Sequence, residues 1–340
     1  MPMDPIFVGG MQRSGTSLMR AIIGSHPDVA MFEWDLPLWT DFFGRFQGRP
    51  LSDPTALKEL LDGIFAHEKY QGCDVQLDRA AIEERIAAAG SASCGLVFQC
   101  FLEEYARALG RPRWGLKTPH NEFFADDIFA AHPTARMVQL IRDPRDVAVS
   151  YQSYDGGSWS YSARDHLAQW KRSLELAQRH ARRYEGRYLA VRYEDLVTHP
   201  EATIRRVCAI VDLDFRPCLL EASGHLGWEG ANSFFNDVGR DKTISTAGIG
   251  RYRTRLRPEL ILLYQSKLRP ELMQWGYNLE EFSPWRRAAI GVRSFGHDAG
   301  ASLRNQARAS KNRLRGLLQR TPWYAPASSL YRCVFRRSSS

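Results

Sequence analysis

The chain has 340 residues, a formal net charge of +8 at pH 7 and an apolar fraction of 44%, which suits one large α/β domain or two modest ones. The positive charge is concentrated at the C-terminal end. Residues 283–340 hold twelve Arg and Lys and a single acid, Asp298, a charge of +11 that leaves −3 for the rest of the chain. The basic character therefore belongs to this segment, and it does not by itself indicate a nucleic-acid enzyme or a nucleic-acid partner.

The cysteine spacing and the length of the apolar runs bear on the cellular location of the protein. The six cysteines form no C-x-x-C pair and no zinc-like spacing with histidine, which is typical of reduced, packed thiols, with a bridge within residues 73–100 as an open alternative. The first predicted strand begins by about residue 6, which leaves no room for a signal peptide, and no apolar run reaches the roughly 18 residues of a membrane span. We therefore expect a cytoplasmic location, with peripheral contact at the inner membrane surface as an open alternative.

Strand and helix patterns alternate along the chain. Apolar or β-branched runs predict four strands, at residues 6–9, 114–116, 137–141 and 188–191. Helical patterns lie between and after them, around residues 18–23, 144–151, 200–211 and 258–275. This alternation is typical of an α/β fold with a central parallel sheet flanked by helices.

Two segments depart from the alternation. Residues 36–110 are mostly helical by pattern, around 55–68, 78–89 and 97–109, and predict a helical insertion that covers one side of the site. The long polar stretch 223–257 is typical of a binding loop or a disordered connection.

The domain boundary follows from charge. We predict one domain over residues 1–282 and a basic, partly helical C-terminal extension over 283–340. In the extension, leucines at 303, 314, 317 and 318 share a helical face opposite basic residues, a pattern that can bind an anionic membrane or an acidic polymer. A solvated arm or an oligomer contact is the alternative.

The segment Gly10-Met-Gln-Arg-Ser-Gly-Thr-Ser17 follows the first predicted strand and has the G-x4-G spacing of a phosphate-binding loop. Thr16 stands where a Walker loop carries the lysine that reaches the β- and γ-phosphates, and Arg13 is the nearest cation. A helix follows, with its free N–H groups directed at the loop. The sequence therefore predicts a loop that binds a phosphate but not an ATP triphosphate, with a purely conformational glycine turn as the alternative.

Polar side chains follow each predicted strand. Arg13, Lys117, Arg142 and Tyr193 come after the four strands in turn, and ligands of open α/β sheets bind beyond the carboxyl ends of the strands. Asp143-Pro144 predicts a helix start after Arg142, with Ser150 two turns into that helix. Three cations converging on one edge beside a phosphate loop predict an anion site.

These residues carry a resemblance to the sulfotransferases. Residues 7–20, with Ser-His-Pro-Asp-Val at 25–29, resemble the 5′-phosphosulfate loop of that family, most of all in the branch of the Golgi protein-tyrosine enzymes and their bacterial relatives. Residues 140–151 resemble the 3′-phosphate motif, an Arg eight residues before a Ser. Shorter segments resemble the catalytic-lysine segment (117–119), the adenine-side segment (192–196) and the late loop that closes over the nucleotide (248–253). The resemblance covers roughly residues 5–280 in the right order.

The resemblance implies a P-loop-like three-layer fold and a donor, 3′-phosphoadenosine 5′-phosphosulfate (PAPS), with an anionic group at each end. One anion site would be the loop, Arg13, Ser14, Gly15, Thr16 and Ser17. The other would be Arg142 with Ser150, joined by Arg251 from the late loop, and Tyr193 would contact adenine. Sulfuryl transfer has no γ-phosphate to clamp, so we expect no metal.

The implied mechanism is in-line attack by an acceptor hydroxyl or amine on sulfur, with Lys117 and Arg13 stabilising the charge that develops on the bridging oxygen. The base is ambiguous, because a gap-free alignment places the glutamate of the protein-tyrosine branch on Trp34. We rank Glu33 first, His120 second and Asp35 third. Ordinary structural roles for all three are the alternative.

Other functional classes remain open at this point. A P-loop kinase of a nucleotide or small metabolite would need a metal and would bind ATP in preference to PAPS, and the missing lysine at Thr16 counts against it. A non-catalytic nucleotide-binding module is the second alternative, which the presence of Lys117 and both anion sites disfavours. The acceptor is unknown, with a glycan or glycolipid preferred. The aromatic residues between 34 and 46 indicate either an acceptor pocket or, more simply, helical core.

Overall fold

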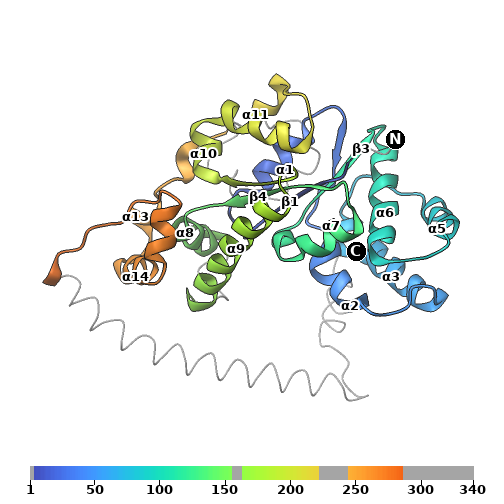
Figure 1. The fold of residues 1–340 in the computed structure, drawn as a ribbon, viewed down its shortest axis with the longest axis horizontal. Helices are drawn as coiled ribbons and strands as arrows, with labels where there is room; N and C mark the ends of the chain where they lie inside the picture. Colours follow the sequence, from blue (N-terminus) through green and yellow to red (C-terminus); the bar gives the residue numbers. More distant parts are fainter. Residues whose placement is uncertain (1–3, 155–162, 222–243, 286–340) are drawn as a thin grey trace, which may run out of the picture. The chain divides into compact units, whose positions relative to one another are not determined.

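The structure, a computed structural model, describes residues 4–154, 163–221 and 244–285. Met1–Leu279 group into one compact unit, shown in Figure 1. Nearly all of the basic extension, with its amphipathic pattern, lies outside the described residues, as does most of the polar stretch 223–257.

A five-stranded sheet forms the centre of this unit. Its strands run in the order β2-β3-β1-β4-β5, and every neighbouring pair is parallel. The bounds are β1 (Ile6–Gly10), β2 (Val29–Met31), β3 (Arg113–Lys117), β4 (Arg136–Ile141) and β5 (Tyr188–Arg192). The four predicted strands are confirmed. The strand β2 was not predicted, because three residues after a His-Pro turn are too few to show a period.

Helices cover both faces of the sheet, which confirms the three-layer α/β fold. In Figure 1, α1, α10 and α11 lie over one face and α7 and α9 over the other. Their bounds are α1 (Thr16–Gly24), α7 (Ala125–Ala131), α9 (Ala163–Arg183), α10 (Tyr193–Thr198) and α11 (Pro200–Val211).

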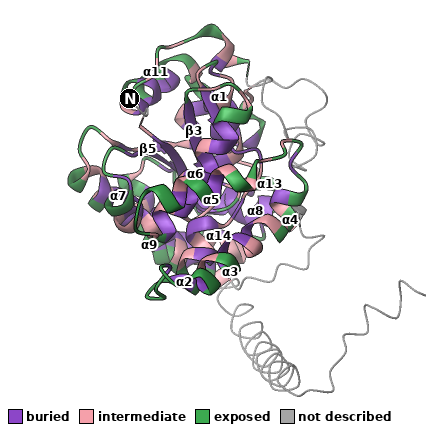
Figure 2. Cartoon of the chain, turned by 90° about the vertical axis from the view of Figure 1, so that its right-hand side faces the viewer, coloured by how far each residue is buried: buried purple, intermediate pink, exposed green. Residues whose placement is uncertain are grey.

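The alternation of side chains along the strands builds two apolar cores. Ile6 and Val8 of β1 pack into the core beneath α1 and α11. Phe7 points to the opposite face, where its ring and that of Trp114 form a T-shaped pair with a centroid distance of 5.5 Å. Both faces of β1 are therefore buried, and strands that show in Figure 2 are coloured mainly as buried. This explains why such strands form continuous apolar runs in the sequence.

The predicted helical insertion is present, and local caps fix its helices. The Asp53 side chain accepts a hydrogen bond from the Thr55 N–H at 2.9 Å, with Pro54 in the first helical position. The helices are a π-helix (Leu38–Phe43), α2 (Gly44–Phe46), α3 (Pro54–Ala66), α4 (Glu68–Gln71), α5 (Arg79–Ala88) and α6 (Cys94–Ala108). Trp39, Phe42 and Phe46 are buried in this core, so the simpler reading of the aromatic stretch, helical core, holds for these three.

The remaining described elements are the 3-10 helices Asn121–Phe124, Pro217–Leu220 and Thr246–Gly248, and the helices α8 (Pro144–Tyr154), α13 (Tyr252–Arg255) and α14 (Pro258–Gln274). Cys73, Cys94 and Cys100 are free thiols, so the alternative of a bridge within residues 73–100 is wrong. In the described part of the chain, no helix combines the length and the apolar character needed to span a bilayer.

Candidate active site

The phosphate loop lies between β1 and α1 in a conformation that only particular residues allow. Arg13 and Gly15 both have positive φ, 66° and 93°. A Cβ atom at Gly15 would lie 2.5 Å from Cδ2 of Tyr193. Both the positive φ and this close approach therefore require glycine at position 15. Helix α1 begins at Thr16 directly after this turn, and its first backbone N–H groups and positive dipole end favour an anion at the loop.

A buried glutamate that the sequence analysis missed anchors the start of this loop. Glu122 is fully buried, and its Oε2 accepts a hydrogen bond from the Gly10 N–H at 2.7 Å. Its Oε1 accepts a second one from the Ser173 hydroxyl of α9 at 2.8 Å. The carboxylate therefore joins the phosphate loop to a helix on the far face of the sheet. No local pattern signals this role, since both contacts are distant in sequence.

Lys117, the last residue of β3, reaches the first turn of α1. The Lys117 side chain is 1% exposed, and its ammonium group donates a hydrogen bond to Ser17 Oγ at 3.0 Å and forms an ion pair with Asp35. Burial lowers the pKa of Lys117 to about 8, against the opposing attraction of Asp35. A cation thus stands at the phosphate loop although the loop itself carries no Walker lysine.

Asp35 is held by two buried cations. Besides Lys117, Nη1 of Arg20 lies 3.3 Å from Asp35 Oδ1. Arg20 belongs to the apolar face of α1 and is 1% exposed, and burial lowers its pKa while Asp35 opposes that shift. The side chain of Asp35 is 38% exposed, so this carboxylate faces both the buried cations and the solvent. Arg20 was not among the predicted site residues, because one arginine in an apolar helix carries no signal of its own.

The other two base candidates have different neighbours. Glu33 is 1% exposed, and its Oε1 accepts a hydrogen bond from the Asp74 N–H at 2.9 Å. His120 has a positive φ of 71°, its Nδ1 lies 4.0 Å from Glu122 Oε1, and its ring packs against Phe123. Among the described residues, Asp35 is therefore the carboxylate that pairs with Lys117, although Glu33 ranked first by sequence.

Arg142 and Ser150 complete the edge beyond β4. The Arg13 Nε donates a hydrogen bond to Ser150 Oγ at 2.9 Å, and Arg142 Nη1 donates to the Arg13 carbonyl oxygen, also at 2.9 Å. The Arg142 guanidinium group lies 4.2 Å from the centre of the Tyr193 ring. The structure therefore brings together the predicted residues of both anion sites and the adenine-side tyrosine.

Two buried polar atoms at this edge have an unused hydrogen-bonding capacity. Within residues 4–154, 163–221 and 244–285, no hydrogen-bond partner lies within reach of Arg142 Nε or Tyr193 Oη. Buried polar groups normally have partners, so a ligand with anionic or acceptor atoms fits this place. Arg251 lies at the N-terminal boundary of α13, and its charge acts on Tyr193 together with that of Arg142, although burial raises the pKa of Tyr193 overall.

Comparisons with known proteins point to one family. A family model described as the sulfotransferase family matches residues 5–217. Protein-tyrosine sulfotransferase 1 of Danio rerio is 27% identical over 236 residues, which cover 68% of this chain and 59% of that protein. Protein-tyrosine sulfotransferase 1 of Homo sapiens is 25% identical over 286 residues, which cover 81% of this chain and 70% of the human protein. The chain thus spans less than two thirds of the Danio rerio relative.

Solved structures agree with this at the level of the fold. The sulfotransferase domain of the Synechococcus PCC 7002 olefin synthase superposes with a TM-score of 0.55 at 21% identity, over 82% of this chain and 97% of that domain. The sulfotransferase domain from the curacin biosynthetic pathway gives a TM-score of 0.54 at 19% identity, over 82% of this chain and 99% of that domain. The family model matches more than half of the chain, and the resemblance seen in the sequence motifs is confirmed: the chain belongs to the sulfotransferase family.

Proposed function

We propose that this protein transfers the sulfuryl group of PAPS to an acceptor hydroxyl. The observation that carries the proposal is the position of Lys117, whose ammonium group comes from the end of β3 to Ser17 in the first turn of α1. In a P-loop kinase the lysine would belong to the loop, at Thr16. Family membership supports the same reaction.

The anion-binding groups suit the two ends of PAPS. The loop and the start of α1 would take the 5′-phosphosulfate, and Arg142 with Ser150 would take the 3′-phosphate, since a guanidinium group and a hydroxyl both donate to phosphate oxygens. Arg142 Nε and Tyr193 Oη, the two buried atoms described above without a hydrogen-bond partner, would be donors to the nucleotide at this edge of the sheet. Arg13 of the loop site donates a hydrogen bond to Ser150 of the 3′-phosphate site, so the two anion sites are neighbours.

In the proposed reaction, the acceptor oxygen forms a bond to sulfur while the bond from sulfur to the 5′-phosphate oxygen breaks. The electron pair of the broken bond stays on that phosphate oxygen, where Lys117 and the loop N–H groups stabilise the new charge. The acceptor proton goes to Asp35, which is the solvent-accessible carboxylate beside Lys117. Arg20 holds Asp35 in place from the buried side.

The acceptor is the open part of the proposal. Two relatives are named protein-tyrosine sulfotransferases, so a tyrosine-containing peptide is one acceptor to test. A glycan or glycolipid, preferred on sequence grounds, is the other.

The test is transfer of labelled sulfate. The full chain is incubated with PAPS labelled at sulfur and with tyrosyl peptides, glycans, glycolipids and simple phenols, and parallel reactions contain γ-labelled ATP and Mg²⁺. Transfer of label from PAPS to any acceptor, without transfer from ATP, is the expected result. Transfer from ATP, with none from PAPS, would replace the proposal with the kinase alternative.

A further inference from the structure

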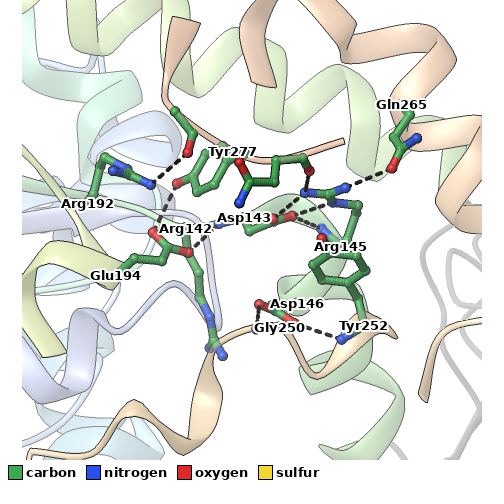
Figure 3. A network of polar contacts seen from close by, with 12 residues as sticks. Arg142, Asp143, Arg145, Asp146, Arg192, Glu194, Gly250, Tyr252, Gln265 and Tyr277 are labelled. Carbon is green, nitrogen blue, oxygen red and sulfur yellow. Dashed lines mark hydrogen bonds and ion pairs between the residues drawn. The ribbon is translucent and has the colours of Figure 1, made fainter. Parts of the chain in front are cut away.

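One carboxylate side chain holds the late loop, residues 248–253, against the start of helix α8. Asp146 Oδ2 accepts a hydrogen bond from the Gly250 N–H at 2.7 Å, and its Oδ1 accepts one from the Tyr252 N–H at 2.9 Å (Figure 3). Both oxygens of one side chain therefore bind the main chain of the late loop.

The placement of Asp146 makes these bonds strong. It lies in the first turn of α8, two residues after Pro144, and is 2% exposed. Burial raises the pKa of Asp146, and the two backbone N–H groups oppose that shift. A buried carboxylate needs such partners, because the cost of removing its charge from water is otherwise uncompensated. If the late loop left, Asp146 would lose both of them.

The first part of the late loop touches the residues proposed to bind the nucleotide. The Gly248 carbonyl oxygen accepts a hydrogen bond from Arg142 Nη2 at 2.6 Å. A Cβ atom at Gly248 would lie 2.6 Å from Tyr193 Oη and 2.8 Å from Arg142 Nη2. The backbone must therefore approach both side chains closely, and the position of this loop fixes where the Arg142 guanidinium group points.

The end of the late loop is fastened to a rigid network. The Arg145 guanidinium group lies 4.0 Å from the centre of the Tyr252 ring. Arg145 is fully buried and donates to both carboxylate oxygens of Asp143, at 2.9 and 2.7 Å, and to Gln265 Oε1 at 2.9 Å. Figure 3 shows Asp146 between this network and the loop. The same helix start thus supplies Asp146 for the loop backbone and Arg145 for its last ring.

We propose that Asp146 is a positioning residue for donor binding: it docks the late loop so that Gly248 holds Arg142 against Tyr193. Asp146 itself touches neither the phosphate loop nor Lys117 in any contact of the described residues, so it acts on nucleotide affinity and not on the transfer step. The identity of the nucleotide rests on the function proposed above, whereas the docking of the loop does not.

The test compares Asp146→Asn with the unchanged chain. Asparagine keeps the shape but presents an NH₂ group to one of the two backbone donors, so one hydrogen bond to a charged acceptor is lost and the other weakened. We expect the dissociation constant of adenosine 3′,5′-bisphosphate and the KM for PAPS to rise by about ten- to a hundredfold, with kcat within a few fold. The control is Glu201→Gln, a change of an exposed glutamate of α11 that pairs with Arg205, with both constants unchanged.

A second variant and a second readout separate docking from function. In Gly248→Ala the added methyl group would clash with Tyr193 and displace the loop while Asp146 is intact. We expect the dissociation constant of adenosine 3′,5′-bisphosphate to rise as it does in Asp146→Asn. Hydrogen exchange of the Gly250 and Tyr252 amides should become faster in Asp146→Asn, with exchange in the β1 and β4 amides unchanged. If exchange becomes faster in Asp146→Asn but the unchanged chain transfers no sulfuryl group from PAPS, the proposed function is wrong and the docking role of Asp146 still holds. Unchanged exchange, or a fall in kcat with no change in KM, would overturn the role of Asp146.

Discussion

The ammonium group of Lys117 and the carboxylate of Asp35 form an ion pair at the carboxyl end of β3, beside Ser17 of the phosphate loop. In the protein without ligand, Lys117 thus neutralises the carboxylate that we assign as the base. A phosphosulfate at the loop offers Lys117 a second anion. In the reaction proposed above, a lysine drawn towards the donor would leave Asp35 with Arg20 and the solvent, so the pair would link donor binding to the acceptor side.

The first prediction concerns Lys117. Lys117→Ala should lower kcat by on the order of a hundredfold or more, since a group that stabilises charge mainly in the transition state is lost, while the affinity for adenosine 3′,5′-bisphosphate stays within a few fold. Single-turnover transfer from labelled PAPS gives the rate, and calorimetry gives the affinity. Lys171→Ala is the control, because Lys171 is an exposed lysine paired with Glu271. Full activity of Lys117→Ala with an acceptor that the unchanged chain uses would contradict the mechanism.

The second prediction separates the base candidates. Asp35→Asn should lower kcat by about a hundredfold while nucleotide affinity changes little, because general-base catalysis contributes roughly 10²- to 10⁴-fold. Glu33→Gln should affect stability more than kcat, since Glu33 is buried against the backbone of Asp74. Asp41→Asn, a change of an exposed residue in the same segment, is the matched control. A larger loss of kcat in Glu33→Gln or His120→Gln than in Asp35→Asn would assign the base elsewhere.

The third prediction follows from the pKa of Lys117, which burial lowers to about 8. Only the protonated ammonium group can stabilise the leaving oxygen, so kcat/KM for PAPS should fall above about pH 8, tenfold for each pH unit at the limit. This ratio reports the free enzyme, which is the state that the structure describes. In Lys117→Arg the decline should move to higher pH, because a guanidinium group stays charged. The same alkaline decline in both proteins would exclude Lys117 as its origin.

The fourth prediction concerns Glu194, which joins three elements next to the site. Its Oε1 accepts a hydrogen bond from the Asp143 N–H at 3.0 Å, and its Oε2 accepts one from the Tyr277 hydroxyl at 3.2 Å. Burial raises the pKa of Glu194 from 4.5 to about 7. The folded state therefore binds the proton more tightly than the unfolded state. The resulting stabilisation is fully present below about pH 4.5 and is lost as the pH rises through 7.

Glu194→Gln imitates the protonated side chain and removes this dependence. Relative to the variant, the unchanged chain should lose roughly 3 kcal/mol of unfolding free energy between pH 4.5 and pH 8, at about 1.4 kcal/mol for each unit of pKa difference. Urea unfolding at several pH values measures the difference, and Glu201→Gln, which alters an exposed glutamate of α11, serves as the control. Parallel stability curves for the unchanged chain and Glu194→Gln would contradict the raised pKa.

The site residues that could be predicted from the sequence are those whose positions the strand ends determine. Arg13, Lys117, Arg142 and Tyr193 could be placed together from sequence because each follows a recognisable strand, and parallel strands end at one edge. Ser150 followed from the helix start at Asp143-Pro144. The sheet and its flanking helices were also predictable, because each has a recognisable local sequence pattern. The exception is the short edge strand β2.

The carboxylates were not predictable, because their roles depend on contacts across the fold. Glu33 and Asp35 lie two residues apart, and only the course of the turn after β2 decides which of them meets Lys117. Glu122 and Asp146 bind main-chain N–H groups more than 100 residues away in sequence. A buried acidic residue within a polar segment looks like a surface residue until its partners are known.

We expect one edge of this sheet to bind a nucleotide that has an anionic group at each end. Calorimetric titration of the full chain with adenosine 3′,5′-bisphosphate, AMP and ATP, each with Mg²⁺ and with a chelator, decides whether this claim is right. We predict much tighter binding of adenosine 3′,5′-bisphosphate than of AMP or ATP, unchanged by the chelator, and a large loss of that preference in Arg142→Ala. Equal affinity for AMP, or tightest binding of ATP in the presence of Mg²⁺, would contradict the claim.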